Sequence, residues 1–238
     1  MSALQQLRTM TTIVADTGDL AAIERLKPID ATTNPSLITK ALIHPDNEAV
    51  LSETMSRHRD DIDAVIDELT IQIGCNILSL IEGRVSTEVD ARLSYDTQAT
   101  IDKALAFMEA YQKAGIDSER VLIKMAATWQ GIEAARYLET QGIHCNLTLL
   151  FGQHQAIACA DAGVTLISPF VGRILDWQKR QQNRQNIPVS DDMGVQSVKL
   201  IYQYYKQHGY KTQVMGASFR STEQILALAG CDLLTIAP

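Results

Sequence analysis

A lysine inside an apolar segment is the residue whose surroundings most clearly suggest chemistry. Lys124 lies in the segment VLIKM, which otherwise has the character of a buried strand. A lysine at a strand end normally extends its ammonium group to water, and this alternative applies here too. If the amine is desolvated instead, it becomes a neutral nucleophile that attacks a ketone to form a Schiff base. The iminium then withdraws electrons, so that a neighbouring carbon–carbon bond can break.

Acidic and amide side chains at other predicted strand ends suit such a reaction. Asp16 and Glu88 are a candidate acid–base pair, one to move a proton at a sugar hydroxyl and the other to assist iminium formation through a water. Each could equally be a helix cap, a turn residue or half of a surface ion pair. Asn34 and Asn146 carry donors and acceptors for sugar hydroxyls. Asn34, however, precedes Pro35 in a sequence that is also typical of a helix start.

Two arginines predict an anion site. Arg173 begins a predicted helical stretch, and Arg220 lies beside Ser221, a candidate N-cap. Helix N-termini offer free N–H groups and the positive end of the helix dipole, and arginine adds bidentate bonds to a phosphate. The alternative is that each arginine is a surface residue paired with an acid, Asp176 or Glu223.

The elements that must position these residues alternate along the chain. Most of the short apolar runs are continuous rather than alternating, as in strands that are covered on both faces. Eight such runs are predicted as strands, at 12–16, 30–33, 84–89, 121–125, 145–150, 164–169, 213–218 and 233–237. Eight strand–helix units favour a closed (β/α)8 TIM barrel over an open doubly wound sheet. The open fold would usually show a glycine-rich phosphate turn after the first strand, where this sequence has ADTGDL.

Helical patterns fill the intervals between these runs. They cover 47–82, 97–114, 129–140, 195–207 and 222–229. Thr128 is a candidate N-cap for the helix at 129, and Ser221 with Gln224 is a candidate capping box for the helix at 222. The sequence ends at Pro238, directly after the eighth predicted strand, so we expect the eighth helix to be missing. Residues 2–10 or a neighbouring subunit, in a homo-oligomer, would then cover the outer face of that strand.

The carboxyl ends of the strands form one face of an α/β barrel, and the chemistry of such barrels is found there. The candidate residues fall at these ends. A spacing of two residues places Ser86 with Glu88, and Asn146 with Thr148, on one face of a strand. Polar side chains that point into a barrel need a wet or reactive centre to satisfy them.

Composition narrows the class of protein. The 238 residues suit a single domain, 1–238, with 21 basic and 28 acidic side chains. The net charge of −7 argues against general binding to nucleic acids or anionic membranes. The first residues lack the apolar core of a signal peptide, and no run approaches the roughly 18 apolar residues of a membrane span. We therefore expect a soluble cytoplasmic protein.

Histidine and cysteine spacing predicts no metal. The five histidines show no HExxH or similar ligand pattern. The four cysteines form no CxxC pair, which fits a reducing compartment better than a disulfide scaffold or a zinc ribbon.

Six segments in the same order resemble those of the transaldolase family. They are DATTNPSL at 30–37, GRVSTEVDAR at 83–92, VLIKMAAT at 121–128, CNLTLLF at 145–151, ISPFVGRILDW at 167–177 and MGASFR at 215–220. The similarity runs from about Thr11 to Pro238 and is greatest to the bacterial and eukaryotic type. It implies a TIM barrel of the class I aldolase type that needs neither a metal nor an organic cofactor.

The resemblance also implies a role for each candidate residue. Lys124 would form the Schiff base, and Asp16 would act on the C4 hydroxyl. Glu88, with a bound water and Thr148, would relay protons during iminium formation. The implied substrate contacts are Asn34, Asn146 and Ser168 to the dihydroxyacetone hydroxyls, Thr32 and Phe170 along the site, and Arg173, Ser218 and Arg220 to the sugar phosphate.

The expected function is therefore transfer of a dihydroxyacetone unit in the pentose phosphate pathway. The donor would be sedoheptulose 7-phosphate or fructose 6-phosphate, and the acceptor an aldose phosphate. One alternative is an aldolase that releases free dihydroxyacetone, although the apolar ring of Phe170 beside the site favours transfer. Another is an inactive binding or assembly module, because family members continue beyond the point where this sequence stops. Ala127 and residues 152–154 depart from the family pattern at positions that are not catalytic.

Overall fold

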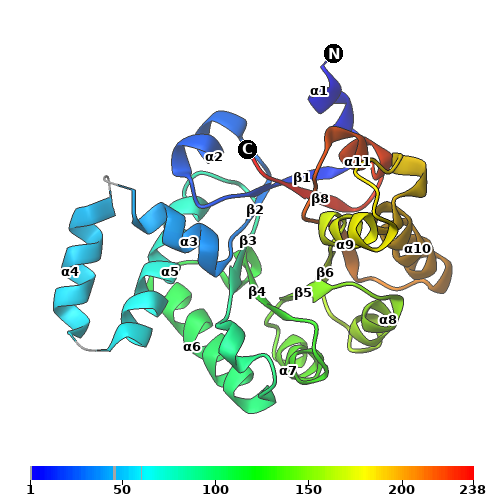
Figure 1. Ribbon diagram of the computed structural model, residues 1–238. Helices are drawn as coiled ribbons and strands as arrows, with labels where there is room; N and C mark the ends of the chain where they lie inside the picture. The colour runs from blue at the N-terminus through cyan, green and yellow to red at the C-terminus, as the bar shows by residue number, and fades with distance from the viewer. Residues whose placement is uncertain (1, 45–46, 60) are drawn as a thin grey trace.

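Eight parallel strands close into a barrel in the computed structural model, which describes residues 2–44, 47–59 and 61–238 (Figure 1). They are β1 (Thr12–Asp16), β2 (Asp30–Thr32), β3 (Val85–Glu88), β4 (Val121–Ala126), β5 (Cys145–Leu150), β6 (Leu166–Pro169), β7 (Gln213–Gly216) and β8 (Leu233–Ile236). Neighbours in the barrel follow chain order, and β1 pairs with β8 to close it. The predicted barrel is confirmed, the open doubly wound alternative is excluded, and each predicted run overlaps one strand.

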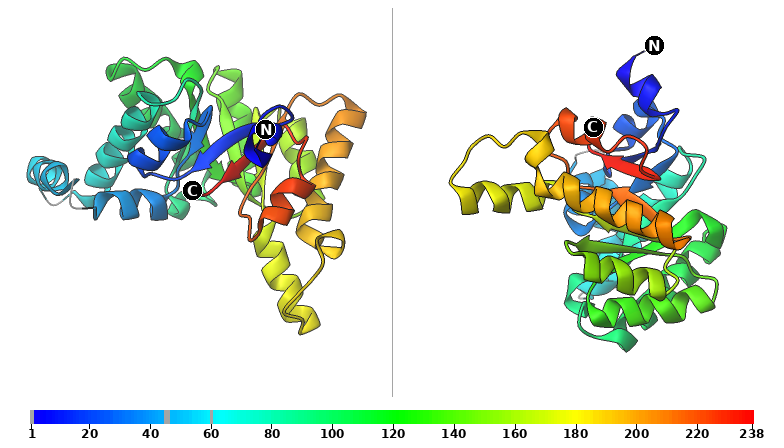
Figure 2. Two further views of the ribbon diagram at one scale, coloured as in Figure 1. Left: turned by 90° about the horizontal axis from the view of Figure 1, so that it is seen from above. Right: turned by 90° about the vertical axis from the view of Figure 1, so that its right-hand side faces the viewer.

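Helices surround the barrel (Figures 1 and 2). In the described part of the chain they are α1 (Ala3–Leu7), α2 (Leu20–Leu26), α3 (Pro35–Leu42), α4 (Glu48–His58), α5 (Ile62–Leu78), α6 (Thr97–Lys113), α7 (Trp129–Thr140), α8 (Gln153–Asp161), α9 (Gly172–Gln182), α10 (Met193–His208) and α11 (Thr222–Ala227). Short 3-10 turns are η2 (Ala91–Leu93), η3 (Ser118–Arg120) and η4 (Val189–Asp191). Figure 2 shows α9, in yellow, projecting away from the barrel.

The single long helix predicted over 47–82 is wrong. The segment contains two helices, α4 and α5, with α4 farther from the barrel (Figure 1). Arg59, after α4, has a φ of 52°, which an α-helix does not tolerate. Asp61 then caps α5, because its side chain accepts a hydrogen bond from the Ala64 N–H at 3.0 Å. The apolar spacing continues across the break, whereas the local polar residues end one helix and start the next.

Capping chemistry agrees with prediction at one helix and differs at another. Thr128 caps α7 as predicted, accepting from the Gly131 N–H at 3.0 Å. Ser221 precedes α11 but makes no capping bond to it, so the predicted capping box is wrong. Gln224 instead accepts from the Arg220 N–H at 2.6 Å and donates to Asp192 at 2.7 Å. The Gln224 side chain therefore joins the loop before α11 to the N-cap residue of α10.

Two apolar layers lie on opposite sides of the barrel wall. Inside, the buried side chains that pack together are Val14, Leu122, Leu166, Met215 and Leu233. Outside, a larger core fills the space between the strands and the helices. This division follows the period of two along each strand. The apolar interior supports the polar carboxyl ends of the strands from below.

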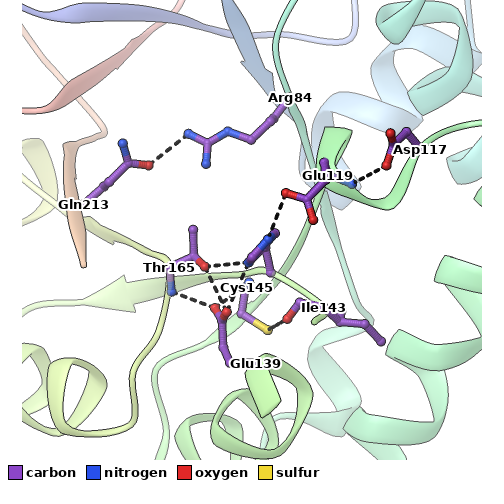
Figure 3. Close-up of polar contacts among 9 residues, drawn as sticks. Arg84, Asp117, Glu119, Glu139, Ile143, Cys145, Thr165 and Gln213 are labelled. Carbon is purple, nitrogen blue, oxygen red and sulfur yellow. Dashed lines mark hydrogen bonds and ion pairs between the residues drawn. The ribbon is translucent and has the colours of Figure 1, made fainter. Parts of the chain in front are cut away.

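A polar network ties the amino-terminal ends of β5 and β6 (Figure 3). Glu139, in α7, accepts from the N–H groups of Cys145 and Thr165 at 2.9 and 2.6 Å. His144 bonds the Thr165 hydroxyl at 2.9 Å and lies 3.3 Å from both Glu139 and Glu119. Across the described residues, no group of three or more His, Cys, Asp or Glu side chains could hold a metal ion. The network therefore serves to join strands at the end opposite the candidate site.

The outer face of the last strand is covered at Leu234, which is fully buried. Side-chain atoms of Leu234, Leu228 and Phe219 converge within 3.4 Å of the position that a Cβ on Gly216 would take. Leu234 therefore packs with Leu228 and Phe219 over Gly216 of β7. Within residues 2–44, 47–59 and 61–238, no helix has the length and apolar character needed to cross a membrane.

Candidate active site

A pocket of about 460 Å³ opens at the carboxyl ends of the strands. It is where the sequence predicted the site to lie. Almost all of the predicted site residues line it: Asp16, Thr32, Asn34, Lys124, Thr148, Ser168, Phe170, Arg173, Ser218 and Arg220. The other two, Glu88 and Asn146, lie behind this wall and bond to residues that form it. The fold thus gathers side chains from seven different strands or the loops that follow them.

Lys124 is buried, with 7% of its surface exposed. Its Nζ donates to the Thr33 carbonyl oxygen at 2.9 Å and lies 2.9 Å from Glu88 Oε2. The pairing of β3 with β4 sets Glu88 directly beside Lys124. The alternative in which the lysine extends to bulk water is therefore wrong. The Nζ and the carboxylate are within hydrogen-bond reach of each other, so a proton can pass between the two groups.

Asp16 lies at the carboxyl end of β1 and is partly buried. Its Oδ1 accepts a hydrogen bond from the Thr32 hydroxyl at 3.0 Å. The Thr32 hydroxyl also lies 2.8 Å from that of Thr235. Only one oxygen of Asp16 is used in these bonds, which leaves the other for a ligand in the pocket. The carboxylate is therefore oriented by a hydrogen bond from the neighbouring strand β2.

Asn146 connects three strands inside the barrel. It is fully buried, donates to Ser86 Oγ at 3.0 Å and accepts from Ser168 Oγ at 2.6 Å. Because β4 and β5 are in register here, Asn146 lies beside Lys124.

Asn34 caps a helix as well as lining the pocket. Its side chain accepts a hydrogen bond from the Leu37 N–H, in α3, at 3.0 Å. The helix-start alternative is correct for Asn34, which lines the pocket as well.

A strained turn in β5 directly follows Thr148. Leu149 has a φ of 55°, a left-handed conformation that is unfavourable for a bulky side chain. The pairing of β5 with β6 shifts register between Leu147 and Leu150. Gln155 holds this turn, donating to the Leu149 carbonyl at 3.2 Å and accepting from the Phe151 N–H at 2.9 Å. The strain is thus maintained by hydrogen bonds from the start of α8.

The opposite end of the pocket carries the arginines. Arg220 donates to Asp176 Oδ2 through Nη2 at 2.7 Å and through Nε at 3.1 Å. Its Nη1 lies 3.2 Å from Ser218 Oγ. The guanidinium of Arg173 stacks over the ring of Phe170, 4.9 Å from its centre. Both arginines remain exposed, as an anion site requires, and the ion-pair alternative is correct for Arg220.

Close packing of two chain segments shapes this end. The N–H of Gly172, at the start of α9, donates to the Ser218 carbonyl at 2.6 Å. A Cβ on Gly172 would lie 2.2 Å from that oxygen, so only glycine fits. Ser218 itself has a φ of 62°, which is strained for a serine. This approach brings the amino end of α9 beside Arg220.

Two polar residues of this region were missed from the sequence. Thr235, in β8, lines the pocket and bonds Thr32. Thr235 lies two residues after Leu233, which faces the barrel interior, and this spacing predicts that Thr235 faces inward too. Gln155 was missed because its contacts are made to a loop whose conformation the sequence does not reveal.

Comparison with known proteins gives one consistent result. Residues 13–238 match the family model described as Transaldolase/Fructose-6-phosphate aldolase. A relative named Transaldolase from Methylococcus capsulatus is 58% identical over 245 residues, covering 99% of this chain and 74% of the relative. One from Acidobacterium capsulatum is 60% identical over 247 residues, covering 100% of this chain and 74% of the relative. A third relative, from Thermosynechococcus vestitus, is 56% identical over 248 residues, and this chain covers 63% of that relative.

Proposed function

The chain belongs to the transaldolase and fructose-6-phosphate aldolase family, and from this premise we propose that it transfers a dihydroxyacetone unit between sugar phosphates through a Schiff base on Lys124. Its relatives carry the name Transaldolase, and the chain is accordingly an enzyme of the transferase class. The observation that carries the proposal is the buried amine of Lys124, 2.9 Å from the Glu88 carboxylate and at the wall of a polar pocket.

The donor in this proposal is a ketose phosphate such as fructose 6-phosphate or sedoheptulose 7-phosphate. Its phosphate would bind Arg173, Arg220 and Ser218, where two cations and the amino end of α9 meet. Its three-carbon end would then reach Lys124, with hydroxyls on the polar side chains of the wall. Those proposed contacts are Thr32, Asn34, Asn146 and Ser168, with Phe170 along the chain of the sugar.

The proposed reaction begins when Glu88 takes a proton from Lys124, leaving a neutral amine that attacks the C2 carbonyl. Glu88 and Thr148 would return protons through a water as the ketone oxygen leaves. Asp16 would then remove the proton of the C4 hydroxyl, and the C3–C4 bond breaks with its electrons drawn toward the iminium. The aldose phosphate departs, and the enamine left on Lys124 attacks the next aldose phosphate.

Borohydride trapping tests this proposal. Fructose 6-phosphate followed by reduction should leave a three-carbon adduct on Lys124, identified by peptide mass spectrometry. Lys124→Ala should lose the adduct and at least 10³-fold in kcat, because the covalent route is gone. Lys199→Ala, an exposed lysine of α10, is the matched control and should behave as wild type. Folded wild-type protein that leaves Lys124 unmodified would refute the mechanism.

A product assay distinguishes transfer from release. The family model covers both activities, whereas the relatives named above are called Transaldolase, which supports transfer. Phe170 lines the pocket, with the ring of Phe151 packed 5.4 Å from it, and would limit water at the enamine. With fructose 6-phosphate alone, product should stop near one equivalent per enzyme, and erythrose 4-phosphate should restore turnover. Steady formation of free dihydroxyacetone would instead identify an aldolase.

We also propose that the enzyme works in the cytoplasm, in the pentose phosphate pathway, as one domain over 1–238. All four cysteines are free, which suits a reducing compartment. Fractionation of cells with antibody detection would test the location.

A further inference from the structure

A second cavity, of about 490 Å³, lies beside the same lysine. It opens between α3, α5, α6 and the segment that follows β3. The residues that line it include Thr33, Asn34, Ile66, Glu88, Ala91 and Phe107. Figure 1 shows these helices together on one side of the barrel, away from α9 and α11. The cavity is therefore separate from the end of the first pocket where the arginines lie.

The two cavities lie on either side of the contact between Lys124 and Glu88. Lys124 lines the first pocket and not the second, whereas Glu88 lines the second and not the first. The Lys124 Nζ contacts Glu88 Oε2 and the Thr33 carbonyl, both at 2.9 Å, and Thr33 also lines the second cavity. Asn34 belongs to both walls. A thin partition of these side chains thus separates the two spaces at the reacting nitrogen.

Schiff-base chemistry needs water to move at this point. When the neutral amine adds to the C2 ketone, the carbonyl oxygen leaves as one water, with one proton from the nitrogen and one from an acid. The iminium nitrogen keeps one proton and the positive charge. Hydrolysis reverses this step and consumes one water. A ketose phosphate that extends from Arg220 to Lys124 would fill the first pocket, so the direct opening is blocked while water is made.

We propose that the second cavity is the passage through which water and protons move between solvent and Lys124, with Glu88 at its inner end. This inference rests on the proposed function. It explains why the carboxylate that must exchange protons faces a different space from the sugar.

The charged residues of this cavity favour water as its occupant over a charged ligand. Its charged residues are already paired with one another. Arg92 lies 2.6 Å from Asp63 and from Asp90, and Lys103 lies 2.5 Å from Asp67. These pairs join three carboxylates to two cations, so the rim carries no surplus positive charge that would attract a second phosphate. Glu88 is likewise paired with Lys124 at the inner end.

Oxygen exchange measures this passage directly. Fructose 6-phosphate is incubated with enzyme in H2¹⁸O, and label at the C2 oxygen is compared with the number of adducts formed, after subtraction of an enzyme-free blank. Ile66→Trp and Ala91→Trp narrow the cavity, and Ile62→Trp is the matched control on α5. Ile66 and Ile62 are both exposed, at 49% and 69%, but only Ile66 lines the cavity. The Trp variants at 66 and 91 should lower label per adduct at least threefold, because the released water returns to the same carbon.

The outcomes separate this inference from the proposed function. If both narrowed variants form the trapped adduct and take up label per adduct as wild type does, the passage lies elsewhere and the inference is wrong. An equal decrease in Ile62→Trp would also overturn it, because that residue lies outside the cavity. If wild type forms no adduct on Lys124 and exchanges no oxygen above the blank, the proposed function fails instead. Circular dichroism confirms that each variant is folded.

Discussion

The ion pair between Arg220 and Asp176 fixes the orientation of the guanidinium at the pocket wall, where Nη1 also contacts the Ser218 and Phe219 carbonyl oxygens at 3.4 and 3.3 Å. Asp176 binds Nε and Nη2, whereas Nη1 is directed to the Ser218 hydroxyl at the pocket wall. Both side chains are substantially exposed, so solvent screens the pair and its energy is modest, about 1 kcal/mol or less. Its main effect is to hold a flexible side chain in the orientation that a phosphate would need.

Asp176→Asn should therefore raise the KM for sugar phosphates about two- to fivefold and leave kcat nearly unchanged. The reason is that Asn keeps one acceptor but loses the charge-assisted bidentate contact. Steady-state kinetics with fructose 6-phosphate measures the effect, and Asp161→Asn, which bonds Tyr210 and does not line the pocket, is the control. A lower KM in Asp176→Asn would mean that the carboxylate competes with the phosphate rather than orienting Arg220.

At this scale the sequence predicted residue types well and bonding partners poorly. Lys124 and Glu88 were each chosen for their chemistry and for their position near a predicted strand end. Their 2.9 Å contact depends on the register of β3 with β4, which no local pattern reveals. The choice for Arg220 between a free cation and an ion pair stayed open for the same reason. Partners distant in sequence are fixed only when the elements pack.

The turn in β5 is the element whose strain matters most to the site. Gln155 makes four hydrogen bonds across it, accepting from the N–H groups of Phe151 and Gly152 and donating to the carbonyls of Ala127 and Leu149. A left-handed leucine costs about 1–3 kcal/mol and persists only when its surroundings over-determine it. Without these bonds the turn would relax and Thr148, the preceding residue, would move.

Gln155→Ala should consequently lower kcat about tenfold while changing KM less than twofold. A shift of Thr148 affects the proposed proton relay to Lys124 but not the arginines proposed to bind phosphate. The rate of borohydride trapping per folded molecule should decrease in parallel. A simple loss of folded protein would leave that rate unchanged. Gln153→Ala, on the same first turn of α8, is the control. An unchanged trapping rate in Gln155→Ala would show that the turn does not need this side chain.

The order of the strands could be predicted because most of them are continuous apolar runs bounded by turn residues, whereas α2, α3 and α8 lie outside the predicted helical ranges. The break between α4 and α5 could not be predicted, since apolar residues recur at helical spacing on both sides of Arg59. Its cause is backbone conformation and a cap at Asp61, which are local and polar. The capping box predicted at Ser221 was wrong for a different reason. There the local pattern was present, but Gln224 bonds Asp192 of a different element.

For the whole molecule, the buried ionisable groups limit the stability of the folded state at alkaline pH. Burial raises the pKa of the Cys159 and Cys231 thiols to about 12, and it raises the pKa of Cys145 and Tyr205 as well. These groups stay neutral in the folded protein at pH values where the unfolded chain has lost their protons. Below the unfolded pKa, near 9 for a thiol, both states are protonated and the groups do not affect stability. Above it, the unfolded state releases protons and is favoured.

The free energy of unfolding should therefore decrease as the pH rises above about 9, with each such thiol contributing up to ~1.4 kcal/mol per pH unit until its folded pKa is reached. Urea unfolding at pH 8 and pH 10.5 measures this slope. Cys159→Ala should be less stable than wild type at pH 8 but should lose less stability between the two pH values, because it lacks one of the thiols. Ile132→Val is the matched control, since it removes a buried methyl group and no ionisable group, so its pH dependence should equal that of wild type. Equal slopes in Cys159→Ala and Ile132→Val would mean that the buried thiol does not couple folding to pH.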